Sequence, residues 1–310
     1  MAVSRRIPAD HGLTVRMFIT GLLLVVLYAV VGGVLYAVGL SMAIVLVVPL
    51  GLAFVQYWFS DKIALWGMKG RIVTPEQEPQ LHGIIDRLCA LADMPKPRVA
   101  IADVDMPNAF ATGRSPSNAV VCATRGIMRR LDEPELEAVL AHEISHVAHR
   151  DVAVMTIASF LGMVAGMVTR VMFYVGMFGG FGGGGGGRNN QSGQNVALME
   201  MAVLLFSVVV YAISFILTMA LSRYRELAAD RSGAILIGRP SLLASALIKV
   251  TGEMSRIPTR DLRSAEHFNA FFFTPALAKG ASVSSLFSTH PPLQKRLDQL
   301  AKLEAQLNQP

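Results

Sequence analysis

Charged residues are scarce in this chain. Asp, Glu, Lys and Arg make up 16% of its 310 residues, whereas hydrophobic residues make up 53%. Because a typical soluble domain has about 25% charged residues, this composition argues against an ordinary soluble protein. The hydrophobic residues gather in long blocks, and we predict that these blocks span a membrane.

Cysteine is scarce as well. The two cysteines, Cys89 and Cys122, have neither the spacing of a metal-binding pair nor that of a disulfide framework. We expect both to be small buried side chains. Nothing in the sequence requires an oxidising compartment.

Acidic residues are outnumbered by basic ones. The 22 Asp and Glu residues stand against 28 Lys and Arg residues, which gives a net charge of +6. Such an excess suits contact with the anionic headgroups of a lipid bilayer. The basic residues flank the apolar blocks and form no continuous stripe, so we expect a lipid surface and not nucleic acid as the partner.

The apolar blocks predict about four transmembrane helices. Residues 17–59 are too long for one such helix and suit two, while 152–169 and 201–221 supply a third and a fourth. A Gly-rich stretch at 179–195 is expected to be a flexible loop between the last two. The alternative is that the second pair is partly buried in protein and does not fully cross the bilayer.

Basic residues predict how the chain is oriented. They lie before and after the first apolar block and again after the fourth segment. Because cytoplasmic flanks of membrane helices are enriched in Lys and Arg, both termini are expected in the cytoplasm. The chain then divides into a first hairpin (1–59), a soluble part (60–151), a second hairpin (152–221) and a second soluble part (222–310).

Local patterns predict the elements of the soluble parts. The sequence 74–77, Thr-Pro-Glu-Gln, matches a capping box and predicts a helix start. Asp132 with Pro134 predicts a second helix start, and Pro292 a third. Three short strands and one further helix are expected between them: Arg98–Ala102, Asn108–Thr112, Ala119–Cys122 and Ser241–Val250. This order is typical of an α+β domain.

The most informative motif is H-E-x-x-H at residues 142–146. On a helix, residues four apart share one face, so both imidazoles can bind one Zn²⁺ ion. Glu143 then lies beside the metal, where its carboxylate can take a proton from a zinc-bound water. The motif therefore indicates a zinc hydrolase.

Two histidines do not complete such a site, because a catalytic zinc has a third protein ligand and one open position. Glu226 and Asp230 lie four residues apart on a predicted helix. One carboxylate can bind the metal and the other can hold a ligating histidine in place. Spacing alone leaves open that Glu226 pairs with Arg223 or Arg225 on an exposed face.

Two other histidines compete for a role in the site. His149 lies three residues after His146 and can replace one ligand, although a histidine near a helix C-terminus is more often stabilised by the helix dipole. His290 precedes a helix start, and by position alone it is a turn residue.

Four stretches taken together resemble a known family. They are Asn-Ala-Phe-Ala-Thr-Gly at 108–113, the motif at 142–146 with Asp151, residues 225–230, and Thr-His-Pro-Pro at 289–292. In this order they resemble the HtpX-type membrane zinc metalloproteases, relatives of the CAAX prenyl endopeptidases with a gluzincin-like core. The implied fold is an α-helical membrane protein with about four transmembrane helices and an α+β gluzincin-like zinc metalloprotease domain.

The resemblance assigns further roles. It makes Glu226 the third ligand of a single Zn²⁺ ion per subunit and places Asp230 behind the ligands. It makes Asn108 and His290 contacts of the substrate or transition state. The implied activity is cleavage of misfolded or damaged membrane proteins at the cytoplasmic surface of a bacterial-type inner membrane, as part of quality control under stress.

Two alternatives to this activity follow from other classes. One is a non-proteolytic membrane scaffold or chaperone with structural zinc, which would need the ligands but not Glu143. The other is a specialised processing protease akin to the CAAX prenyl endopeptidases. Those enzymes have more transmembrane helices than the four or so expected here.

The predicted orientation is testable. A reporter enzyme fused after Pro310 should be active in the cytoplasm, because the last soluble part follows a basic flank. A fusion in the Gly-rich loop should report the opposite side. A C-terminal reporter that is active only outside the cytoplasm would contradict the orientation.

Overall fold

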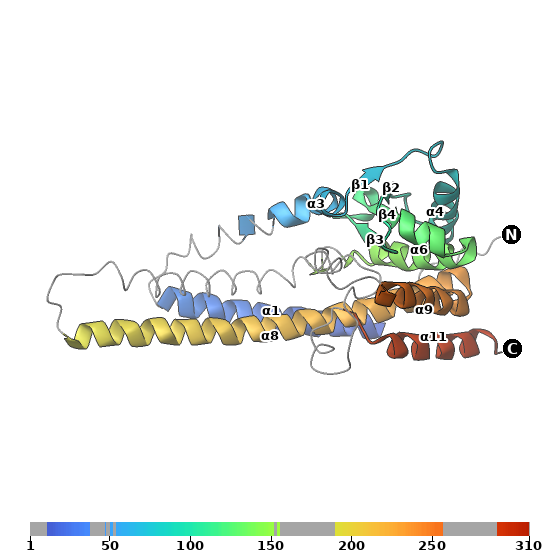
Figure 1. Cartoon of the computed structure of the whole chain (residues 1–310). Helices are drawn as coiled ribbons and strands as arrows, with labels where there is room; N and C mark the ends of the chain where they lie inside the picture. The colour runs from blue at the N-terminus through green and yellow to red at the C-terminus, as the bar shows by residue number, and fades with distance from the viewer. Residues whose placement is uncertain are drawn as a thin grey trace. The chain divides into compact units, whose positions relative to one another are not determined.

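The structure is a computed structural model that describes residues 11–37, 47, 50–51, 54–151, 154–155, 190–256 and 290–309 (Figure 1). The described residues fall into two compact units. The first contains those of Val55–Val154 and Met219–Pro310 with residues 11–15, and the second contains those of Arg16–Phe54 and Met155–Thr218.

A four-stranded mixed sheet forms the centre of the first unit. Its order is β1 (Gly70–Ile72), β2 (Arg98–Ala102), β4 (Val120–Thr124), β3 (Ala109–Thr112). The central pair β2 and β4 is parallel, and each edge strand is antiparallel to its neighbour. Every residue of β4 is buried, as expected for an inner strand. Strand β3 lies at one edge of the sheet.

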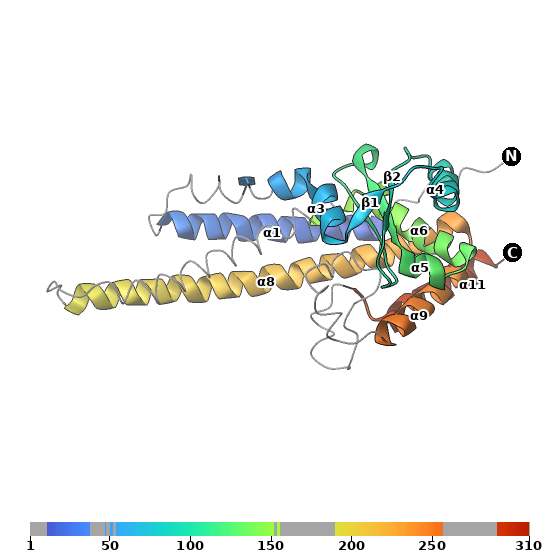
Figure 2. The ribbon, with the colours of Figure 1, turned by 45° about the horizontal axis from the view of Figure 1, so that its top comes forward.

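Helices pack on this sheet and on one another. They are α3 (Ser60–Gly67), α4 (Pro79–Ala92), α5 (Arg125–Arg130), α6 (Glu133–Ala148), α9 (Pro240–Arg256) and α11 (Leu293–Leu307). Helix α6 contacts β3, β4, α4 and α9, and α11 packs on α9 (Figures 1 and 2). Because α6 is enclosed on several sides, twelve of its 16 residues are buried.

The start of α6 is fixed by a capping box. The Asp132 side chain accepts a hydrogen bond from the Glu135 N–H at 3.0 Å, and the Glu135 side chain accepts one from the Asp132 N–H at 3.2 Å. Pro134 occupies the first turn, where a missing N–H costs nothing. The predicted start at Asp132 and Pro134 is therefore confirmed.

The helix predicted to start at Thr74 begins later. Residues 75–77 form a turn instead, in which the Thr74 N–H donates to Gln77 Oε1 at 3.1 Å. Helix α4 starts at Pro79, after Glu78 with φ −140° and ψ 67°. The prediction was wrong because the Gln77 N–H donates to the backbone oxygen of Thr74, as in a turn, where a capping box would use the Thr74 side chain.

The other strands and helices predicted in the soluble parts agree closely with the structure, whereas the last six residues of the loop predicted over 179–195 belong to a helix that starts at Asn190. The three strands lie within two residues of their predicted bounds, and the last helix begins directly after Pro292. The helix expected over Ser241–Val250 is longer and runs from Pro240 to Arg256. Both Cys89 and Cys122 are buried free thiols, as expected. Strand β1 and helices α3 and α5 were not predicted.

The membrane helices are described only in part. Helix α8 (Asn190–Ile237) contains the one described segment, Val208–Ile237, that is long and apolar enough to cross a bilayer. Helix α1 (His11–Ala37) contains a shorter apolar stretch, Phe18–Leu27. The predicted third segment lies almost wholly outside the described residues, so the count of four is not confirmed.

The C-terminal part of α8 approaches α6 very closely at Gly233. A Cβ atom at this position would lie 2.8 Å from the backbone nitrogen of His142 and 2.9 Å from its Cα. Real Cβ atoms essentially never come so near to backbone atoms. The two helices can therefore keep this distance only with glycine at 233.

Substituting this glycine should destabilise the protein. In Gly233→Ala, we expect the new methyl group to push α6 and α8 apart, at a cost of about 1–3 kcal/mol for an overpacked core. The matched control is Gly83→Ala, in a helix where a Cβ meets nothing within 4 Å. Thermal unfolding of the two variants should show a lower midpoint for the first only. Equal midpoints would contradict the close packing.

Candidate metal centre

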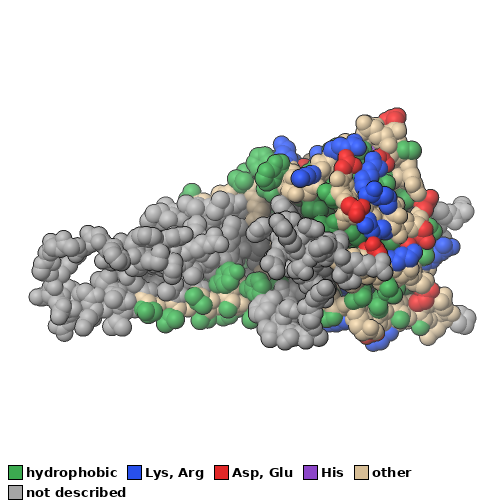
Figure 3. Space-filling model, in the orientation of Figure 1, with side chains coloured by type: hydrophobic (Ala, Val, Ile, Leu, Met, Phe, Trp, Pro, Cys, Tyr) green, Lys and Arg blue, Asp and Glu red, His purple; other side chains and the backbone are tan. Residues whose placement is uncertain are grey.

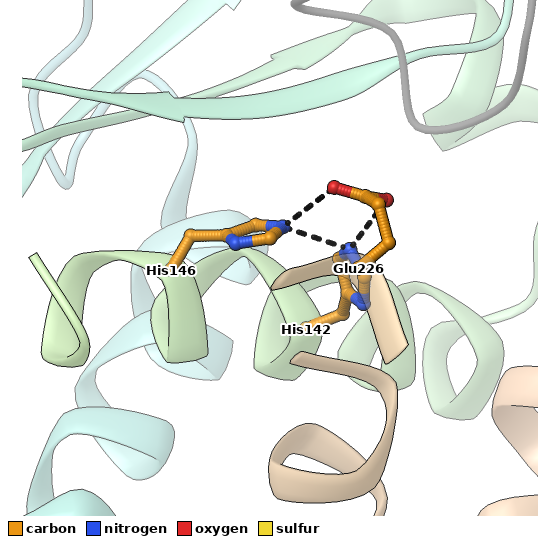
Figure 4. A group of neighbouring side chains, drawn as sticks. All are labelled: His142, His146 and Glu226. Atoms are coloured by element: carbon orange, nitrogen blue, oxygen red, sulfur yellow. Dashed lines mark hydrogen bonds and ion pairs between the residues drawn. The ribbon is translucent and has the colours of Figure 1, made fainter. Parts of the chain in front are cut away.

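Helix α6 presents two histidine rings side by side. His142 and His146 are one turn apart, and their Nε2 atoms lie 3.1 Å from each other (Figure 4). The rings are perpendicular, with centroids 4.7 Å apart. Both side chains are buried, so their nitrogens converge on one point in the interior.

Helix α8 adds a carboxylate to this pair. Glu226 Oε2 lies 3.7 Å from His142 Nε2, and Oε1 lies 3.4 Å from His146 Nε2 (Figure 4). The residue is only 6% exposed, so it does not lie on the surface, and the alternative of an exposed pair with Arg223 or Arg225 is wrong.

The three side chains fit a metal ion. One ligand atom from each lies within 4.8 Å of the others. Ligand atoms of a tetrahedral zinc site, with bonds of about 2.0–2.1 Å, stand about 3.3 Å apart, which is close to the separations found here. His149 instead lies at the C-terminal end of α6, and the structure does not place it in this cluster.

An aspartate holds the far side of each histidine ring. His142 Nδ1 lies 2.9 Å from Asp230 Oδ1, and His146 Nδ1 lies 2.5 Å from Asp151 Oδ2. A carboxylate at Nδ1 favours a proton there, which leaves the Nε2 lone pair for a metal. Asp230 and Asp151 therefore orient the two rings.

Each of these aspartates is bound in turn by an arginine. Arg296 of α11 makes two bonds to Asp230, of 2.7 and 2.6 Å, and is itself only 1% exposed. The Nε of Arg225 lies 3.1 Å from Asp151 Oδ2. Burying an unpaired carboxylate charge costs a large free energy. Each arginine reduces this cost, because it compensates the charge of the aspartate that it binds.

Neither arginine was assigned this role from the sequence. Arg296 does carry a signal, since it occupies the apolar face of the last helix, with Leu293 three residues before it and Leu300 four residues after it. A cation on such a face needs a buried partner. Asp151 was part of the family resemblance, together with the motif at 142–146, but no contact was predicted for it.

Burial and charge set the protonation of the centre. Burial raises the pKa of Glu143 to about 8, opposed by the nearby His146 and by the backbone of Ala111. Burial disfavours a charged His146, but bonds to Asp151 and Glu226 outweigh it and raise its pKa to about 10. Because a metal-ligating imidazole is neutral, metal binding must release this proton.

The structure also places the two residues expected to contact substrate. His290 is buried, and its Nδ1 lies 3.0 Å from Glu226 Oε2, so it belongs to the centre. Asn108 precedes β3, where its backbone N–H donates to Thr124 Oγ1 at 2.9 Å. Asn108 is thus fixed at the start of the edge strand that packs against α6.

A small pocket opens beside His146. It is bounded by the end of β3, the following loop and the end of α6; its lining residues are Ala111, Thr112, Gly113, Ser115, His146, Val147, Arg150 and Asp151. The pocket therefore connects His146, a member of the candidate metal cluster, with the edge of the sheet.

Comparisons with known proteins agree with this geometry. The model of peptidase family M48 matches residues 75–304. "Protease HtpX homolog 1" of Streptomyces coelicolor is 53% identical over 98% of this chain and 97% of its own. "Protease HtpX homolog" of Moorella thermoacetica is 51% identical over 98% and 99%, respectively.

One solved structure shares the fold. The crystal structure of S. mikatae Ste24p superposes with a TM-score of 0.55 at 17% identity, and the match covers 94% of this chain and 67% of that one. At this level of identity, the similarity shows the fold alone.

The arginine behind His142 can be tested by substitution. In Arg296→Met, we expect metal affinity to fall roughly 10- to 100-fold, because Asp230 loses its partner and no longer fixes the ring. The control is Lys295→Met, which changes an exposed neighbour on the same helix. Metal affinity is measured by competition with a chelator. Unchanged affinity in Arg296→Met would show that Asp230 holds the ring without it.

Proposed function

The chain belongs to peptidase family M48, and we propose that it is a zinc-dependent endopeptidase that cleaves misfolded or damaged membrane proteins at the cytoplasmic membrane surface. His142, His146 and Glu226 would hold one Zn²⁺ ion per subunit. The observation that carries this proposal is their buried cluster on two helices, next to an additional buried acid, Glu143.

As a member of this family the chain is a membrane metallopeptidase. A bound zinc ion would supply a Lewis acid that polarises a carbonyl group and makes water nucleophilic near neutral pH. Glu143 takes the proton of the attacking water and passes it to the leaving amine. Its side chain is 4% exposed and interacts with the backbone N–H of Ala111, which supports a fixed position facing β3.

His290 and Asn108 are assigned to the substrate. His290 lies against Glu226, so its second ring nitrogen can donate to the carbonyl oxygen on which negative charge develops. Asn108 lies at the start of β3, where a side-chain amide can bind the backbone of a bound peptide.

The edge strand β3 supplies a binding mode for that peptide. Its inner edge pairs with β4, and its outer edge has no strand partner among the described residues. An extended substrate can add to this edge through backbone hydrogen bonds. The pocket beside His146 then lies next to the bound backbone.

The substrate class rests on the nearby apolar segments. Glu226 follows the predicted end of the fourth segment, at Leu221, by five residues, and α6 ends at Ala148, four residues before the third segment starts. Two ligand-bearing segments are thus close in sequence to predicted membrane helices. A site so connected suits the loops and ends of membrane proteins that emerge from the bilayer.

Chain length distinguishes this proposal from a specialised processing protease. The chain covers 97% of the Streptomyces relative but 67% of the Ste24p chain, so its length matches the former. A scaffold with structural zinc is the other alternative, and it differs in having no need for Glu143.

Replacing the proposed base provides the test. In Glu143→Gln, we expect peptide cleavage to fall by at least about 10²-fold, since the amide cannot take a proton, while bound zinc per subunit is unchanged. The measurement compares cleavage of a membrane-protein substrate and of an unfolded soluble one by the purified full chain.

A second glutamate on α6 provides the control. Glu137 pairs with Arg87 at 2.7 Å and lies outside the cluster, so Glu137→Gln should retain activity. Equal cleavage by wild type and Glu143→Gln would reject the enzyme mechanism. Cleavage of the soluble substrate alone would reject the membrane-protein substrate class.

A further inference from the structure

Helix α3 carries large apolar side chains on its outer side. Phe59, just before the helix, Ile63 and Trp66 are 38%, 43% and 81% exposed, and the last value is the highest among the described large hydrophobic residues. The opposite side contains the buried Asp61 and Ala64. A helix in water has the reverse arrangement, with its large apolar residues turned inward.

The outer residues form one continuous face. Positions 59, 62, 63 and 66 recur at helical spacing, and we call this set, with Trp58, the α3 face. Lys62 Nζ lies 5.4 Å from the centre of the Phe59 ring, and the guanidinium of Arg114 lies 4.2 Å from that of Trp58. Aromatic rings are thus interleaved with cations, on a segment that contains both tryptophans of the chain.

Positive charge dominates around this face. Arg71 pairs with Asp103 at 3.4 Å. Residues 55–72 otherwise include Lys62 and Lys69, against a single acid, Asp61. That acid pairs with Arg98 at 2.6 Å and is buried, so it does not offset the outer charges. Hydrophobic and basic side chains lie next to one another in this part of the surface (Figure 3).

We propose that the α3 face docks the catalytic unit onto the headgroup layer of an anionic bilayer. Tryptophan and lysine are the residues that favour this layer, because each has an apolar body and a polar end. Anionic headgroups complement the excess of lysine and arginine. A face of this composition beside a predicted membrane segment suits lipid better than a protein partner, whose binding core is depleted in lysine.

Docking in this way also positions the entrance to the metal centre. Tyr57 donates its hydroxyl to the backbone oxygen of Arg114 at 3.0 Å, and Arg114 stacks on Trp58. The residues on either side, Gly113 and Ser115, line the pocket beside His146. When the α3 face is docked, it therefore holds the pocket at the level of the headgroups. That the pocket then receives membrane substrates rests on the proposed function.

The two tryptophans make the docking directly measurable. The full chain is placed in nanodiscs of phosphatidylcholine with or without phosphatidylglycerol. The variant Trp58→Phe leaves Trp66 as the one fluorophore of its kind. We expect spin labels on lipid headgroups to quench Trp66 more strongly than labels at the acyl-chain ends, and phosphatidylglycerol to shift its emission to shorter wavelength.

Charge variants test the lipid preference. In Lys62→Gln with Lys69→Gln, the shift caused by phosphatidylglycerol should be lost. The control pair Lys295→Gln with Lys302→Gln, on α11, should retain it. Strong quenching of Trp66 by aqueous acrylamide with none by lipid labels would overturn the proposal. The proposal would also be overturned if self-association of the protein prevented lipid labels from quenching Trp66, since the α3 face would then bind a second copy.

The effect on proteolysis separates this proposal from the proposed function. In Trp66→Ser, cleavage of a membrane-protein substrate should fall several-fold, while cleavage of a soluble peptide is unchanged. Ile248→Ser, at an exposed apolar position on α9, should alter neither. If the wild type cleaves neither substrate, the proposed function is wrong, but the fluorescence measurement still tests docking. Equal loss on both substrates would defeat the docking role.

Discussion

The neutralisation of buried charge is the constraint on which the metal centre depends. Two carboxylates, Asp151 and Asp230, are almost completely buried behind the histidine ligands. Removing one partner from a buried ion pair typically costs about 3–5 kcal/mol. Arg225 and Arg296 are therefore needed, because they compensate the charges of the two aspartates that hold the rings of His146 and His142 in the interior.

This constraint explains why distant parts of the chain meet. The first of three segments ends near Asp151, the second contains Glu226 and Asp230, and the third runs from His290 to Arg296. Each segment contributes a charge that another segment must balance. The last helix is thus tied to the centre through the bonds of Arg296 to Asp230, although it contributes no metal ligand.

The sequence predicts best what is local or chemically distinctive. The capped start of α6 at Asp132 and the strand at 98–102 follow from short patterns, and the cluster at 142–146 follows from helical spacing. The turn at 74–77 was mistaken for a helix start because the bond from the Thr74 N–H to the Gln77 side chain occurs in both structures. The pairing of Arg296 could not be predicted, since its partner, Asp230, lies 66 residues away. Apolar length indicates membrane helices, but it does not establish their number.

The edge position of β3 has a consequence for how substrates would be selected. Backbone hydrogen bonds are the same for every amino acid except proline. If substrates pair with β3 as proposed, the strand selects for segments that can become extended, whatever side chains they carry. Folded helices and paired strands offer no such segment. Selection would then depend on whether the target has lost its structure, and a folded copy of the same protein would not be cleaved.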